Sequence, residues 1–345
     1  MTPTRRSFLL LPALGLLPNR TQSKISLPER IPVTRLLLGG DVMLSRYVGA
    51  LARQREDPAW PLREVADLFA SADIAFVNLE APFSDRGKPV ESGMIFKAEP
   101  EMIAALELAG IDIVSTANNH ARDCDGYGVE FTLNWLTSHG IAAVGSAKSA
   151  DAAHAGAVLT RNGTRFGFLA YTYDQSNGNH PDLDDRIAAL DADQMRSDVR
   201  EMLGGTTDAT NAAADRVREP SPGGVPAAKA DVVIVSMHAG VEYAPKPNRE
   251  QIEFAQAAID AGARVVVGHH PHVVQPWERV GESVIFYSLG NLVFDQFQRE
   301  ETQHGALAQV RFAGPRLVDA EMVPVDIART GPRLAGIAPE IALRR

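Results

Sequence analysis

Short apolar runs alternate with amphipathic stretches along most of this chain. Six runs rich in Val, Ile and Leu are each bounded by turn residues, which is typical of buried strands. They cover residues 33–41, 72–80, 110–120, 230–238, 263–272 and 283–291. Between them, the pattern predicts helices over residues 62–71, 100–109, 128–139 and 249–261. This alternation predicts an α/β fold with largely central strands.

Other stretches depart from this pattern. Residues 204–229 are rich in Gly, Thr, Ala and Pro and lack periodicity, so we expect a flexible surface insertion there, after a helical stretch near 191–203. Two later strand patterns, 306–312 and 317–327, suit the edge of a sheet. Residues 329–345 are expected to form a loose tail.

The predicted strands end in carboxylates and imidazoles, whereas ordinary turns favour Gly, Pro, Ser and Asn. In α/β sheets, ligands bind beyond the carboxyl ends of the strands, so such side chains there predict a metal site. The expected ligands are Asp41, Glu80, Asn119, His238, His270 and His272. Asn118, Glu242 and Asn291 are further candidates for substrate contacts.

Three histidines crowd into the sequence HHPH at residues 269–272. Side chains two apart in an extended segment share one face. Pro271 disfavours a helical conformation for His270, which predicts that the segment stays extended. We therefore expect His270 and His272 to converge on the metal, and His269 to face the other way in a supporting or structural role.

Hard oxygen and imidazole donors without thiolate suit a divalent transition metal such as Mn, Zn or Fe. Six candidate ligands are more than the four that one tetrahedral ion binds, so we expect one or two ions. Centres with two metal ions typically catalyse the attack of water on a phosphorus ester. His120 would hydrogen-bond a phosphoryl oxygen or protonate the leaving group, and Asp123 would orient it.

Composition narrows the class of protein. The chain has 345 residues, 45% of them apolar and 22% charged, which is typical of a globular protein with a substantial core. The formal charge of −9 and the lack of a dense Lys/Arg patch argue against nucleic acid as a partner. The single cysteine, Cys124, excludes an internal disulfide framework. Cys124 is either a nucleophile or, more commonly for a lone cysteine, a small buried residue.

The N-terminus has the features of an export signal. Arg5 and Arg6 precede an apolar run over residues 8–17, which is too short to span a bilayer and resembles a twin-arginine signal. We assign residues 1–24 to this signal and residues 25–32 to a linker. The expected location is periplasmic or extracellular. The cleavage site is poor, so an uncleaved membrane tether is the alternative.

The motifs GGDVML, VNLEAPFS, STANNHARD, SMHAGVEY, GHHPHVVQ and FYSLGNLVFDQ occur in this order. Together they resemble the CapA family of capsule and poly-γ-glutamate synthesis proteins, over residues 33–328. The family is similar to calcineurin-like metallophosphoesterases. That resemblance implies a single domain with a four-layer α/β/β/α sandwich and a dinuclear metal site.

The resemblance assigns the same residues. Asp41 matches the first metal ligand of the superfamily, and Glu80 stands where its bridging carboxylate lies. The remaining matches are Asn119 and His120 with the Asn-His pair, His238 with the single histidine, and His270 and His272 with the His-x-His motif. Two positions depart from the expected pattern. Met43 replaces a superfamily histidine, as in the capsule family generally, and Asp125 stands where the family commonly has glycine.

Three functions follow as hypotheses. The first is an exported protein of cell-surface polymer synthesis with a metal-dependent phosphoesterase-like site, acting on a phosphoester or an anionic polymer. The second is a non-catalytic factor that binds the polymer or docks a membrane synthase. The third is a metal-dependent hydrolase of γ-glutamyl amide bonds, since such metals also activate attack on carbonyls.

Overall fold

A computed structural model describes residues 31–86, 94–175, 180, 182–204, 229–328 and 331–335. The chain divides into two units, Met1–Ile31 and Pro32–Arg345, and the fold below is that of the second. The predicted signal segment, residues 1–24, and residues 205–228 of the predicted insertion lie outside the described residues.

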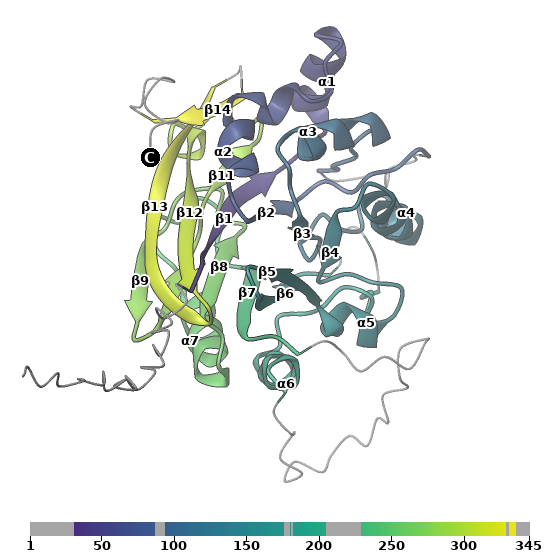
Figure 1. The fold of residues 1–345 in the computed structure, drawn as a ribbon. Helices are drawn as coiled ribbons and strands as arrows, with labels where there is room; N and C mark the ends of the chain where they lie inside the picture. Colours follow the sequence, from purple (N-terminus) through teal and green to yellow (C-terminus); the bar gives the residue numbers. More distant parts are fainter. Residues whose placement is uncertain are drawn as a thin grey trace, which may run out of the picture. The chain divides into compact units, whose positions relative to one another are not determined.

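Two β-sheets form the centre of the second unit (Figure 1). The larger sheet has the order β14-β13-β12-β1-β2-β3-β4, with β11 paired to β1. Its strands are β1 Val33–Val42, β2 Ile74–Leu79, β3 Ile113–Ser115, β4 Ala142–Val144, β11 Asn291–Val293, β12 His304–Ala313, β13 Arg316–Ala328 and β14 Gly331–Leu334. The smaller sheet has the order β5-β6-β7-β8-β10-β9. Its strands are β5 Ala157–Arg161, β6 Thr164–Thr172, β7 Val232–His238, β8 Val265–His269, β9 Trp277–Val280 and β10 Ser283–Phe286.

Helices cover the outer face of each sheet (Figure 1). The α-helices are α1 Arg46–Gln54, α2 Ala66–Ala70, α3 Ile103–Leu108, α4 Asp125–Ser138, α5 Ala150–Ala155, α6 Ala192–Met202 and α7 Arg249–Ala261. Three short 3-10 helices are η1 Trp60–Val65, η2 Pro100–Met102 and η3 Glu301–Gln303.

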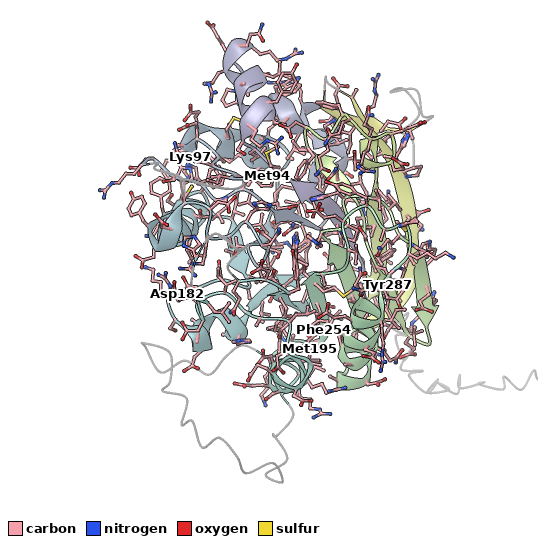
Figure 2. The ribbon with its side chains drawn as sticks, turned by 180° about the vertical axis from the view of Figure 1, so that it is seen from behind. Met94, Lys97, Asp182, Met195, Phe254 and Tyr287 are labelled. Carbon is pink, nitrogen blue, oxygen red and sulfur yellow. The ribbon has the colours of Figure 1, made fainter. Side chains whose placement is uncertain are left out.

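The period-2 alternation of the strands sorts their side chains into separate cores. In β1, Leu36 and Leu38 point between the two sheets, whereas Leu37 points to the helices beneath the larger sheet. On the outer face of the smaller sheet, Met195 of α6 and Phe254 of α7 lie close together in the third core (Figure 2). Three cores separate four layers, so the expected α/β/β/α sandwich is confirmed.

Most predicted elements are present, with local differences. The helix predicted over 249–261 is α7, and a capping box starts it, in which the Asn248 side chain accepts from Gln251 N at 2.9 Å and Gln251 Oε1 accepts from Asn248 N at 3.0 Å. Of the strand predicted over 110–120, only β3 is extended. The expectation of a loose tail from residue 329 is wrong for Gly331–Leu334, which pair with β13 as β14.

The strand predicted over 283–291 is two strands in different sheets. β10 pairs with β8 in the smaller sheet, whereas Asn291 begins β11, which pairs with β1 in the larger sheet. The link between them passes Gly290, whose φ of 66° lies in the left-handed region. The carbonyl of Gly290 accepts a hydrogen bond from Asp41 N at 3.0 Å. This crossing ties the two sheets together beside Asp41.

Gly40 is required by this close approach. A Cβ at position 40 would lie far inside van der Waals contact of the Gly290 carbonyl oxygen. We expect Gly40→Ala to lower the free energy of unfolding by about 3 kcal/mol or more, because two backbones would have to separate. Urea unfolding measures this.

The matched control is Gly49→Ala in α1, where the nearest atom to an added Cβ is 3.4 Å away. There alanine should be neutral or stabilise by roughly 0.5–1 kcal/mol, because glycine is a poor helix former. Equal effects at the two positions would contradict the packing argument.

Candidate metal centre

Strand ends from both sheets place three buried donors within reach of one ion. Asp41 lies near the end of β1, Glu80 directly follows β2, and His238 is the last residue of β7. One ligand atom from each lies within 4.8 Å of the other two, and all three side chains are fully buried. The geometric expectation that acidic and imidazole side chains of separate segments share a site is met by these residues.

Asp41 is surrounded by hydrogen-bond donors. Its Oδ1 accepts from Asn78 Nδ2 at 2.8 Å and lies 3.3 Å from His269 Nδ1. Its Oδ2 accepts from His270 N at 3.3 Å and lies 3.3 Å from His272 Nδ1. Burial by itself raises the pKa of Asp41, but the contacts with the two imidazoles outweigh it and hold the pKa well below the ordinary value.

Glu80 is in the opposite situation. Neither of its carboxyl oxygens has a hydrogen-bond partner in the described part of the chain, and His272 Nε2 is 3.7 Å from Oε1. Burial, followed by the negative charges of Asp41, Glu242 and Asp123, raises the pKa of Glu80 well above its ordinary value. A carboxyl group without donors is costly to ionise here, and a bound cation would remove that cost.

The imidazoles of the site are suited to ligation. Burial lowers the pKa of His238 well below its usual range, and burial with the neighbouring His272 lowers the pKa of His270 to about 3. Neutral imidazole is the form that binds metals. The His270 ring lies 5.0 Å from that of His238 and 6.0 Å from that of His272, and His270 Nδ1 is buried without a hydrogen-bond partner among the described residues. The donors therefore fit a divalent transition-metal ion.

The path of the HHPH segment differs from the extended one predicted. β8 ends at His269, and His270 and His272 have φ values of 95° and 57°, in the left-handed region. The chain turns there, so the two-residue alternation does not apply. The prediction that His269 faces away is wrong, because its Nδ1 lies 3.3 Å from Asp41. His270 and His272 still reach the site, by way of the turn.

The loop after β3 brings Asn119 and His120 to the same place. Asn119 Oδ1 lies 2.8 Å from His238 Nε2. His120 Nδ1 lies 2.7 Å from Asp123 Oδ2, which also accepts from Phe96 N at 2.6 Å, and the Phe96 ring stacks on His120 with centroids 3.8 Å apart. This arrangement suits the orienting role expected of Asp123, while the catalytic roles of both residues stay predictions.

Sequence reasoning missed Asn78, which contacts both Asp41 and His238. The signal was available, because Asn78 lies two residues before Glu80 in the same predicted strand. Residues two apart share a face, so Asn78 had to lie beside the site.

Comparison with known proteins agrees with this geometry. Residues 35–296 match the family described as "Bacterial capsule synthesis protein PGA_cap". The chain belongs to this family. It is 28% identical over 309 residues to "Capsule biosynthesis protein CapA" of Bacillus anthracis, covering 88% of this chain and 69% of that one. It is 29% identical over 301 residues to "PGA biosynthesis protein CapA" of Bacillus subtilis (strain 168), covering 85% and 71%.

A solved structure supports the fold alone. The chain is similar to a hypothetical protein from Thermus thermophilus, with a TM-score of 0.50 and 16% identity over 85% of this chain and 99% of that one. Among the described residues, no helix combines the length and apolar character needed to cross a bilayer.

The two positions that depart from the expected pattern, Asp125 and Met43, have local explanations. Asp125 has a φ of 57°, a conformation that glycine adopts readily, and its side chain is exposed, so its charge faces solvent. Met43 is fully buried, and its sulfur accepts from Ser45 N at 3.3 Å and Ser45 Oγ at 3.0 Å. The sulfur therefore has its own partner where the superfamily has an imidazole.

The three substrate-contact candidates differ in their surroundings. Asn118 is buried, donates to Leu79 O at 2.8 Å and accepts from His120 N at 3.1 Å. Asn291 is buried, and its Oδ1 lies 2.9 Å from His272 Nδ1. Glu242 is exposed. The geometry gives the two asparagines contacts that hold the site loops, and a substrate role for any of the three stays a prediction.

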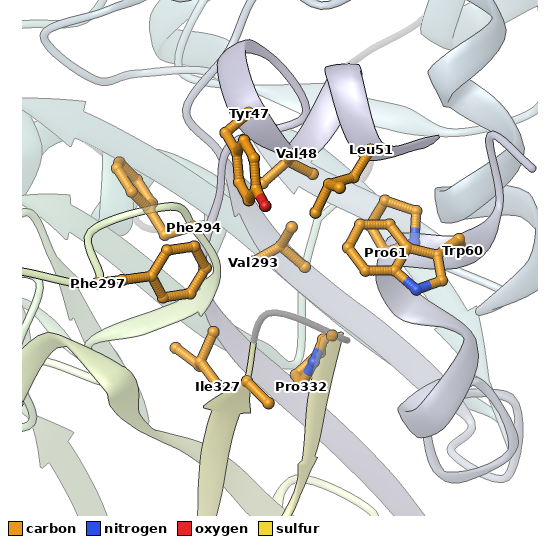
Figure 3. A pocket seen from close by; sticks show the side chains of 12 residues that line it. Tyr47, Val48, Leu51, Trp60, Pro61, Val293, Phe294, Phe297, Ile327 and Pro332 are labelled. Atoms are coloured by element: carbon orange, nitrogen blue, oxygen red, sulfur yellow. The ribbon is translucent and has the colours of Figure 1, made fainter. Parts of the chain in front are cut away.

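An apolar pocket lies on the other side of Phe294 (Figure 3). Tyr47 and Leu51 of α1, Trp60 of η1 and Phe297 line it. The Phe294 ring is 4.7 Å from that of His272 and 5.6 Å from that of Phe96. One phenyl ring thus separates this pocket from the imidazoles of the metal centre.

Cys124 is buried, and burial followed by the charge of Asp123 raises the pKa of its thiol to about 12. The thiolate is the reactive form, so this favours the structural interpretation of Cys124. At pH 8, we expect alkylation by iodoacetamide to be more than about 100-fold slower in the folded protein than in urea. Mass spectrometry measures the rate, and similar rates in both conditions would contradict the assignment.

Proposed function

We propose that this protein is an exported CapA-like factor of capsule or poly-γ-glutamate biosynthesis with a metal-dependent, phosphoesterase-like hydrolytic site. The observation that carries the proposal is the convergence of Asp41, Glu80 and His238 from two sheets around a carboxyl group that has no hydrogen-bond donor among the described residues. Membership of the capsule synthesis family supports the biological setting.

Asp41, Glu80 and His238 would hold the ion, and Asn119, His270 and His272 are the further donors at hand. When bound, a divalent transition metal supplies Lewis-acid activation of an ester and of the attacking water. With an ion bound, the carboxyl groups of Asp41 and Glu80 would be ionised and balance its charge, and neutral imidazoles would complete the donor set.

His120 is the group of this chain suited to move a proton. Its Nδ1 contacts Asp123, and its Nε2 is the atom that we propose donates to a phosphoryl oxygen or to the leaving group. The stacked Phe96 ring and the hydrogen bond from Phe96 N to Asp123 hold this pair in one orientation. Positioning of this kind raises the efficiency of proton transfer.

We propose one ion rather than two. A second ion would need the donor that Met43 replaces, and the Met43 sulfur is already engaged by Ser45. The ligand groups found in the described part of the chain make a single cluster, Asp41, Glu80 and His238.

The relatives named for capsule and PGA biosynthesis suggest the substrate class and location. We propose that the substrate is a phosphoester or an anionic surface polymer, that residues 1–24 direct export, and that membrane synthase subunits are the partners. The negative charge of the chain confines contact with a polyanion to the metal centre.

A non-catalytic, polymer-binding role is the second candidate. Met43 favours it, because its sulfur accepts a hydrogen bond from Ser45 in place of binding a second ion, and one ion alone does not make the two-metal clamp typical of phosphoester hydrolysis. Turnover separates the two roles. Comparing the hydrolysis of an aryl phosphodiester with that of a γ-glutamyl anilide separates phosphoester from amide hydrolysis.

Elemental analysis of the exported protein tests the proposal. We expect close to one divalent transition metal per chain in the wild type and a loss of most of it in Glu80→Gln, which keeps the shape but removes the charge. Hydrolysis of an aryl phosphodiester should fall roughly 10–100-fold or more in His270→Ala.

His304→Ala is the matched control, because His304 is exposed and pairs with Asp326 at 2.9 Å, so metal and turnover should be unchanged. Protein without metal would overturn the proposal. Metal without turnover of either substrate would favour the binding role, and two ions per chain would exclude the single-ion centre.

A further inference from the structure

The loop that follows β11 connects the metal centre to two arginines. Phe294, at its start, has its ring 4.7 Å from that of His272. The next residue, Asp295, has a side chain that is only 3% exposed, and its Oδ1 lies 3.3 Å from Arg46 Nη2. Arg299 lies four residues further along the same loop. One arginine therefore pairs with the segment that packs against the metal centre, and the other belongs to it.

Arg46 lies over the ring that stacks on the predicted proton donor. Its Cζ is 5.5 Å from the centroid of the Phe96 ring, and the Phe96 centroid is 3.8 Å from that of His120. A cation within about 6 Å of a ring centroid is attracted to the ring. Arg46 also has a φ of 51°, a left-handed conformation that is uncommon for residues other than glycine. Such conformations cluster at functional sites, so the backbone favours a functional role for Arg46.

Arg299 lies over a second ring beside the centre. Its Cζ is 4.4 Å from the centroid of the Tyr243 ring, and that ring is 6.3 Å from the ring of His272. Thr302 Oγ1 donates to the Arg299 carbonyl at 3.0 Å, and Gln296 Nε2 donates to Tyr243 Oη at 3.3 Å. Both Thr302 and Gln296 are buried. The Arg299 side chain is exposed, but its backbone and the ring beneath it are held by these contacts.

Both guanidinium groups can accept a further anionic partner. The Arg46 side chain stays 36% exposed beside its buried carboxylate, and no ion pair of Arg299 is found among the described residues. A guanidinium has five N–H donors in a planar fork that suits oxyanions. The carboxyl groups of the metal centre and the net charge of −9 oppose the approach of an anion elsewhere. The two arginines therefore mark where anionic groups of a substrate would be bound.

We propose that Arg46 and Arg299 are specificity-determining residues that bind oxyanion groups flanking the reacting group of the substrate, one beside His120 and one beside His272. Two such sites next to one metal centre suit a chain along which carboxylate or phosphate groups recur. Of the two substrate classes proposed above, this favours the anionic polymer. The inference rests on the proposed function, because the metal centre is where the reacting group would bind.

Isothermal titration calorimetry of the manganese-loaded protein tests this with two probes, hexaglutamate and linear hexaphosphate. We expect the dissociation constant of the probe that binds to rise about 3–10-fold in Arg46→Gln and in Arg299→Gln, because each variant loses one partly exposed, charge-assisted contact. The two losses should multiply in the double variant, since each arginine contacts a different group of the chain. The probe that responds identifies the oxyanion as carboxylate or phosphate.

Arg165→Gln is the matched control, because it removes the same charge far from the centre. Arg165 lies at the start of β6, whereas Thr172, at the other end of that strand, stands beside His238 in register. Binding of the probe should be unchanged in this variant. Arg299→Gln keeps the proposal testable if Arg46→Gln does not fold, because no ion pair of Arg299 within the described part of the chain would be lost.

Three results would overturn the proposal. They are a wild type that binds neither probe, unchanged binding in the Arg46 and Arg299 variants, and an equal loss in Arg165→Gln, which would be an effect of net charge alone. The manganese content of each sample is measured alongside. If the wild type holds no manganese, the proposed function fails, and the same titrations without metal still decide whether the two arginines bind the chain.

Discussion

A carboxyl group buried between two sheets without a hydrogen-bond donor is the constraint on which the rest of this centre depends. Glu80 is fully buried, and neither oxygen has a hydrogen-bond partner in the described part of the chain. Leaving an ionised carboxylate in this state costs several kcal/mol, and a proton or a cation removes that cost. The cluster around Glu80 contains the donors that a cation needs, so the cost is best understood as a consequence of building a binding site.

The four-layer fold can hold such a site, because the cores on either side keep the strand ends rigid. The inter-sheet core reaches Phe76, whose ring lies 6.0 Å from that of His269, and Phe96 stacks directly on His120. Around this core, His270 and His272 adopt left-handed conformations that cost of order 1–3 kcal/mol each. Strain of this kind persists only where the surrounding packing determines the backbone.

The sequence was sufficient to predict the layers and most of the donors, because both follow from local alternation. Leu36, Leu37 and Leu38 form an unbroken apolar run, which is typical of a strand covered on both faces. Two features were beyond reach. The division of residues 283–291 between two sheets depends on which strands pair, and β10 and β11 have no local difference that encodes it. The turn at His270 and His272 brings these two residues to the same place as His269, which ends β8, because tertiary contacts override the extended preference before proline.

The two carboxyl groups differ in their hydrogen bonds, and this difference explains how the centre can be well ordered and still favour the binding of a cation. Asp41 has a hydrogen-bond donor at each oxygen, from Asn78 Nδ2 and the backbone of His270, and the imidazoles of His269 and His272 lie 3.3 Å away, so the protein itself stabilises its charge. Glu80 has no such balance. The first carboxylate therefore fixes the geometry and the second provides the driving force for binding, since only Glu80 gains its first strong partner when an ion arrives. A site in which both carboxylates had hydrogen-bond donors would be stable without a metal and would gain little from binding one. A site in which neither carboxylate had donors would lack the contacts that fix its geometry.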